Sequence, residues 1–208
     1  MVHDRGGVRP VAAVAGLSTA AGVGLLAVSV VATRRLWFGG YVSEAGIPTE
    51  PTAALYQAGM VSVAVGLVLL ALAVANTVPA AGWLLVVSGA FSGVSGAMPC
   101  SEGCPLPPYE ATTMTDLVHA GASVVAVAGV TLAIGAVAIA AAADPRWRRL
   151  SGIAFWVVGG LVAAAAAAML GIGRGHVTGL LERVILVATT AWLLYSCAHL
   201  ALPRSARS

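Results

Sequence analysis

Charged residues are scarce in this chain, and lysine is absent altogether. They make up 9% of the 208 positions, against about 25% in an average soluble domain. All 11 basic residues are arginines, and they are scattered, so no basic stretch can follow a phosphate backbone. Nucleic-acid binding is therefore excluded. Three cysteines do not make a disulfide-knot scaffold, and an apolar composition with little charge excludes a disordered chain.

Apolar residues take the place of charge, at 59% of the chain with a mean hydropathy of +0.94. Six stretches lack Asp, Glu, Lys and Arg, and each is close to the roughly 20 residues that cross a bilayer core. The pattern predicts an all-α bundle of six transmembrane helices in one integral membrane domain, residues 1–208. The expected spans are residues 11–33, 53–76, 80–99, 117–143, 150–170 and 184–202.

An even number of spans puts both termini on one side of the membrane, and the arginines indicate which side. One face would carry Arg5, Arg9, Arg146, Arg148, Arg149, Arg204 and Arg207, and the other would carry Arg34, Arg35, Arg174 and Arg183. Since short cytoplasmic loops retain basic residues, we expect both termini in the cytoplasm. The first span is too long for the core of a signal peptide, so we expect a retained helix.

The predicted outer loops, 34–52 and 100–116, are long enough to fold over the bundle. Cys100 and Cys104 lie in the second of them, facing a compartment where disulfides persist. We favour a structural disulfide. A free or metal-binding pair and a redox-active pair remain alternatives, because a CxxxC spacing alone is a weak motif.

A stripe of serines runs along the third span, formed by Ser88, Ser92 and Ser95, beside a stripe of glycines. Small residues at this spacing allow helices to approach closely in lipid. The stripe therefore indicates either tight helix packing or a polar cleft that contacts substrate.

Asp116, His119 and Ser123 share one helical face at the start of the fourth span. An ionisable residue at the membrane boundary is costly and is a functional candidate by default. Thr113 and Asp116 also have the spacing of a capping box, in which the acid only satisfies free amides of the first turn. Both interpretations stay open, and the two roles can coexist.

Several other residues are candidates near the mouth of the bundle. Glu44, in the first outer loop, is either a solvated acid or a second catalytic acid. Arg34 and Arg35 are candidate ligands for an anionic head group. Tyr56 and Trp192 are candidate substrate contacts, although an interfacial belt and a helical core explain them equally well. We expect no metal and no cofactor, because the sequence has no paired His spacing and no Gly-rich phosphate loop.

The chain resembles a known family in five segments that occur in a fixed order. They are Ser43-Glu44-Ala45-Gly46 before Pro48-Thr49, Leu55 to Gly59, Cys100 to Pro108, Asp116 to His119, and Gly179 to Arg183. Together they look like the uncharacterised prokaryotic six-helix membrane family catalogued as domain of unknown function nine-nine-eight. The resemblance implies a six-span fold in a prokaryotic cytoplasmic membrane and no settled activity. A looser similarity, in size and helical character only, is to small integral membrane terpene cyclases.

These features predict a membrane-embedded enzyme that acts by acid–base catalysis on a lipid or isoprenoid substrate. Asp116 would donate the proton, His119 would relay it, and Glu44 would be the second acid. A terpene cyclase that protonates an alkene or epoxide is one such enzyme. The alternative is a non-catalytic lipid carrier, transporter or membrane assembly subunit. A metal-dependent lipid hydrolase is a third and weaker hypothesis.

Overall fold

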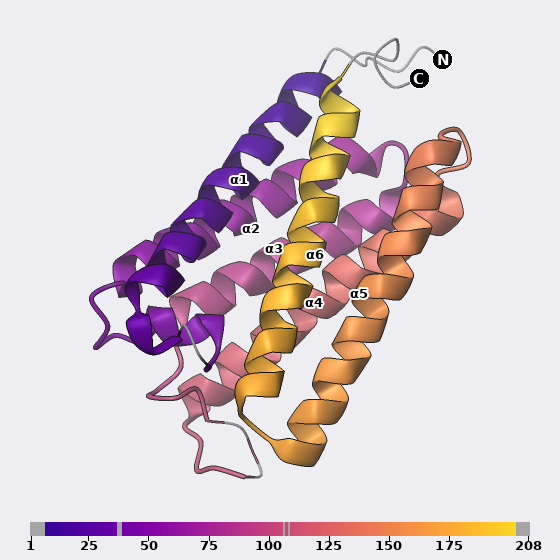
Figure 1. Ribbon diagram of the computed structural model, residues 1–208. Helices are drawn as coiled ribbons and strands as arrows, with labels where there is room; N and C mark the ends of the chain where they lie inside the picture. Colours follow the sequence, from indigo (N-terminus) through magenta and orange to yellow (C-terminus); the bar gives the residue numbers. More distant parts are fainter. Residues whose placement is uncertain (1–6, 37–38, 106, 108, 203–208) are drawn as a thin grey trace.

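The computed structural model describes residues 7–36, 39–105, 107 and 109–202 of the chain (Figure 1). Over these residues it contains six long helices and no strand. Each helix is long and apolar enough to cross a membrane, which confirms the predicted all-α, six-span bundle. The helices are α1 (Val8–Ala32), α2 (Ala53–Ala75), α3 (Pro79–Ala97), α4 (Met114–Ala140), α5 (Pro145–Ile172) and α6 (His176–Ala201).

The last two helices begin earlier than the sequence predicted. α5 starts at residue 145 rather than 150, and α6 starts at residue 176 rather than 184. Each of these two predicted spans began just after an arginine, because charged residues were taken to lie outside the span. Helical hydrogen bonding, however, continues through charged residues. Asp144 caps α5 by accepting a hydrogen bond from the Trp147 amide at 3.1 Å, and Pro145 occupies the first turn. As a consequence, Glu182 and Arg183 lie in the second turn of α6.

The helices form a closed ring. Each packs on the next along the chain, and α6 returns to pack on α1 as well as on α5. Figure 1 shows α6 in front of the others, between α1 and α5. α1 and α2 approach closely at Gly22, where an added Cβ would lie 2.7 Å from the Gly59 carbonyl oxygen. Glycine is needed there because any side chain would push the two backbones apart.

The two ends of the bundle differ. α1 begins and α6 ends at the same end, called here the terminal end (Figure 1). The opposite end, called the mouth, carries two short 3-10 helices, η1 (Arg34–Leu36) and η2 (Val42–Gly46), and the connection from α3 to α4. Which side of the membrane the mouth faces stays a prediction.

Candidate functional site

A lid, residues 39–52, covers the mouth. It is joined to α6 by the Val42 amide, which donates a hydrogen bond to Oε2 of Glu182 at 2.8 Å. The backbone of the lid also touches α6 directly, since a Cβ on Gly179 would lie 2.4 Å from the Gly40 carbonyl oxygen. The lid is therefore packed on the helices rather than extended into solvent.

Glu44 lies inside this lid and is 4% exposed, so it is not the solvated loop acid that one hypothesis allowed. Its Oε1 accepts a hydrogen bond from the Tyr41 amide at 2.9 Å and lies 4.0 Å from Nη1 of Arg174. These contacts close the turn of η2. Arg183 binds η1, which precedes the lid, by donating a hydrogen bond to the Leu36 carbonyl oxygen at 2.9 Å.

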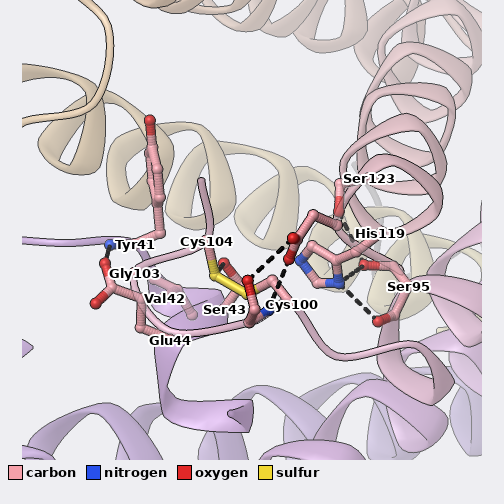
Figure 2. Close-up of a disulfide and its surroundings, with 12 residues drawn as sticks. Tyr41, Val42, Ser43, Glu44, Ser95, Cys100, Gly103, Cys104, His119 and Ser123 are labelled. Atoms are coloured by element: carbon pink, nitrogen blue, oxygen red, sulfur yellow. Dashed lines mark hydrogen bonds between the residues drawn. A yellow bond between two sulfur atoms is a disulfide. The ribbon is translucent and has the colours of Figure 1, made fainter. Parts of the chain in front are cut away.

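The predicted disulfide between Cys100 and Cys104 is present and buried beneath the lid (Figure 2). Tyr41 and Ile47 of the lid pack against it. The Ser43 hydroxyl lies 3.3 Å from Sγ of Cys104, within hydrogen-bonding distance. The disulfide thus holds the lid and the connection between α3 and α4 together.

Asp116 is 2% exposed and anchors the disulfide loop to the first turn of α4. Its carboxylate accepts four hydrogen bonds, from the amide and hydroxyl of Ser101 and from the amide and hydroxyl of Thr113, at 2.7 to 3.0 Å. The Thr113 hydroxyl accepts from the Asp116 amide in return, which confirms the predicted capping box. Four donors occupy most of the lone-pair positions of a carboxylate, so Asp116 has little capacity left for a substrate.

His119 lies one turn deeper on α4 and is 5% exposed. Its Nδ1 is 2.9 Å from the carbonyl oxygen of Ser95 and 3.0 Å from that of Met98, with the Ser95 hydroxyl at 3.3 Å (Figure 2). A carbonyl oxygen only accepts, so in the neutral ring these partners assign the proton to Nδ1 and the lone pair to Nε2. Nε2 makes no hydrogen bond within the part of the chain that the structure describes.

A cavity of about 160 Å³ lies under the lid. Its volume is below the roughly 300–1,000 Å³ typical of pockets that enclose a whole drug-sized ligand. Among the groups on its wall is Glu182, whose Oε1 has no hydrogen-bond partner in the described residues. The cavity is lined by Tyr41, Ser43, Cys100, Cys104, Pro105, Asp116, His119, Ala120, Ser123, Val124, Met169 and Glu182.

Tyr41 contributes to this wall, but its hydroxyl is buried without a hydrogen bond of good geometry. Burial raises the pKa of the Tyr41 phenol, and the nearby Thr178 side chain offsets part of that rise. The phenol therefore keeps its proton at neutral pH.

A second cavity, called the outer cleft, measures about 590 Å³ and is bordered by the start of the lid, the disulfide loop and the connection from α5 to α6. It is bordered by side chains of both charges, including Glu44, Glu102, Arg174 and His176. Arg174 is held by the Gly103 carbonyl oxygen and by Glu110, whose Oε1 lies 3.7 Å from Nε. The outer cleft thus belongs to the contacts that fasten the loops together.

The other residues considered from the sequence do not line the cavity under the lid. Ser88, Ser92 and Ser95 are buried on α3, and a Cβ on Gly129 of α4 would lie 2.3 Å from the Ser88 hydroxyl, so the stripe packs helices. The contact at Ser88 favours the first of the two interpretations, tight helix packing, over a serine-lined cleft. Ser95 alone reaches the site, through His119 and through the Ser123 hydroxyl at 2.8 Å.

The aromatic and basic candidates also lie elsewhere. The Tyr56 ring is buried beneath Gly46 of the lid. Trp192 is in the core and donates a hydrogen bond to the Ser151 hydroxyl at 2.9 Å. Arg34 is exposed in η1 and borders neither cavity, and the side chain of Arg35 lies outside the described part of the structure.

Sequence reasoning missed two features. The predicted sixth span began at residue 184 and so left Glu182 outside it, whereas α6 begins at residue 176 and Glu182 lines the cavity. Sequence reasoning also missed a cluster at the terminal end, where Nε2 of His199 lies 2.6 Å from Oδ2 of Asp144. The spacing of Asp144 before Pro145, a helix-start signal, could have located the acid but not its partner 55 residues away.

Together the fold and the site define a small multi-pass membrane protein with a largely apolar cavity, containing a few polar side chains, at one end of its bundle. Residues 20–199 match the model of a family described as "Protein of unknown function (DUF998)", and the chain belongs to this family. No curated protein and no solved structure matches the chain. The resemblance stated from the sequence is confirmed, and the looser similarity to terpene cyclases gains no support.

Proposed function

We propose that this chain is a membrane-embedded enzyme that transfers protons to or from a lipid or isoprenoid substrate in the cavity under the lid. One observation carries the proposal. Nδ1 of His119 is bound to two backbone carbonyl oxygens, which leaves Nε2 as an acceptor at the wall of a cavity. A histidine held in one tautomer with a free nitrogen is suited to general-base catalysis.

The roles of the acids differ from those first expected. Asp116 is a positioning residue in this scheme, because it fixes the disulfide loop and the start of α4 through its four hydrogen bonds. Glu44 shapes the lid in the same way. Glu182 becomes the second reacting group, since it borders the cavity and its Oε1 has no partner in the described chain.

A cyclisation that begins by protonation of an alkene or epoxide is one reaction of this kind. Glu182 in its protonated form would give the proton, and Nε2 of His119 would remove a proton from the final carbocation. The proton count then balances, and the exchange of protons between the two groups resets the site. We place the mouth on the extracytoplasmic side, where the disulfide would persist.

The test uses purified protein in nanodiscs with pools of prenyl lipids and prenyl alcohols, and chromatography with mass spectrometry to detect products. His119→Asn retains a donor near the position of Nδ1 and removes Nε2, so it should lower turnover by about 10²–10⁴-fold. His119→Gln, which places its amide nearer the position of Nε2, should not rescue proton transfer. His176→Ala at the exposed outer cleft is the matched control and should retain activity.

Full turnover by His119→Asn would overturn the proposal. A non-catalytic lipid carrier, transporter or assembly subunit is the second candidate, and it is favoured by the structural bonding of Asp116, the acid first expected to react. It predicts that lipid binds and that no product forms with any pool.

A further inference from the structure

Resting on the function above, we propose that the cavity under the lid binds a lipid whose head carries a hydroxyl or an ammonium group, and that it rejects an anionic head. Its wall combines unfilled hydrogen-bond acceptors with acidic side chains. Both features concern the head group and are independent of the reaction that follows.

The unfilled acceptors are Nε2 of His119 and, in the ionised form of the carboxyl, Oε1 of Glu182. The first is fixed as an acceptor by the carbonyl oxygens bound to Nδ1. The second belongs to a carboxyl whose other oxygen is already bound to the Val42 amide. A polar atom in an apolar surrounding is costly unless it finds a partner. An ammonium head group can donate to both acceptors, whereas a hydroxyl can donate to one of them and can accept from Glu182 when that carboxyl is protonated.

The charged residues on the cavity wall also favour a head group that is not anionic. Among the described side chains, Asp116 and Glu182 border the cavity, and no arginine does. Arg183 is engaged by the carbonyl oxygens of Gly179 and Leu36, and Arg174 borders the outer cleft instead. A phosphate in the cavity would therefore meet carboxyl groups without a counter-ion, which is strongly unfavourable in a desolvated site.

The cavity also indicates where the lipid tail lies. Val124 lines the cavity and is 66% exposed, so one rim of the cavity reaches the lipid-facing surface of α4. Val124 is ten residues below Met114, the first residue of α4, which is about 15 Å along the helix axis. Since a volume of about 160 Å³ holds only part of a lipid, the head enters the cavity while the chain stays in the bilayer.

Native mass spectrometry of the full chain, released from detergent micelles, measures this preference in one spectrum. The probes are dodecanol, dodecylamine and dodecyl phosphate at equal concentration, so that only the head group differs. We expect adducts of the alcohol and the amine, and at least tenfold less of the phosphate. Dominant binding of the phosphate would overturn the inference.

Glu182→Gln keeps an oxygen for the Val42 amide and removes the carboxylate that an ammonium head group would face in the ionised form of Glu182. It should lower the amine adduct roughly tenfold or more relative to the alcohol adduct. Glu102→Gln, an exposed acid outside this cavity, is the control and should change neither. An unchanged amine adduct in Glu182→Gln would contradict the inference. Alcohol binding without any turnover would refute the proposed enzyme and leave the head-group preference intact.

Discussion

The two ends of the bundle contain similar residues in different states. At the terminal end, Nε2 of His199 lies 2.6 Å from Asp144, and the His199 ring stacks on Trp147 and Tyr195 with centroids 5.7 Å apart in both cases. At the mouth, Nε2 of His119 has no such partner among the described residues, and the His119 side chain lines a cavity. An acid and a histidine therefore do not by themselves indicate a functional site. The mouth differs because its histidine, His119, has a hydrogen-bond acceptor without a partner in the described residues and lines a cavity.

The largest expected effect is at the terminal end. Trp147 is 1% exposed, and its indole N–H donates a hydrogen bond to the Ser196 hydroxyl at 3.1 Å. Trp147→Ala should lower the free energy of unfolding by about 3–5 kcal/mol, because it leaves a cavity and an unpaired hydroxyl. Thermal unfolding in detergent, followed by intrinsic fluorescence, measures the change.

Trp156→Ala is the matched control on the same helix, since Trp156 is 79% exposed on the lipid-facing side of α5. It should leave stability nearly unchanged. Equal losses in the two variants would show that the terminal cluster does not stabilise the bundle specifically.

The next largest expected loss of stability is at the mouth and tests whether Asp116 has a structural role. Asp116→Asn replaces one acceptor oxygen by a donor that faces other donors, so it should cost about 2–3 kcal/mol of stability. Glu102→Gln, in the same loop and exposed, should cost almost nothing. The same unfolding assay compares the two. A fully stable Asp116→Asn that had lost activity would return this acid to a directly catalytic role.

A smaller effect is expected for the pair at the terminal end. Asp144→Asn keeps the cap on the Trp147 amide and removes the charged partner of His199. A double-mutant cycle with His199→Ala should give a coupling of about 1 kcal/mol, reduced because the Asp144 side chain is 31% exposed. Additive single changes would mean that the short contact contributes no net stability.

The smallest effect is expected at Tyr41. Its hydroxyl is buried without a well-aligned partner, so Tyr41→Phe should change stability by less than about 0.5 kcal/mol at neutral pH. Because burial raises the pKa of the phenol, ionisation favours the unfolded chain, and wild type should lose stability relative to Tyr41→Phe only above the ordinary value of 10.0. Urea titrations at several pH values test this, and a large loss at neutral pH would indicate a firm bond to Thr178.

Much of the architecture was predictable because hydrophobic runs of the right length report membrane spans directly. The capping box at Thr113 and Asp116 and the disulfide were predictable as well, since both depend on local spacing. The position of Glu182 on the cavity wall was not predictable, because it depends on where α6 begins. The charged residues at 182 and 183 were taken to lie before the start of that helix. The serine stripe was ambiguous for a physical reason, since helix packing in lipid and a polar cleft use the same small residues.

The central claim is that His119 presents an unprotonated Nε2 to the cavity. ¹⁵N NMR of histidine-labelled protein in nanodiscs tests it most directly, with the His119 signals assigned by their loss in His119→Asn. In the neutral ring, we expect a protonated Nδ1 and a pyridine-type Nε2. A neutral ring with its proton on Nε2 would contradict the claim.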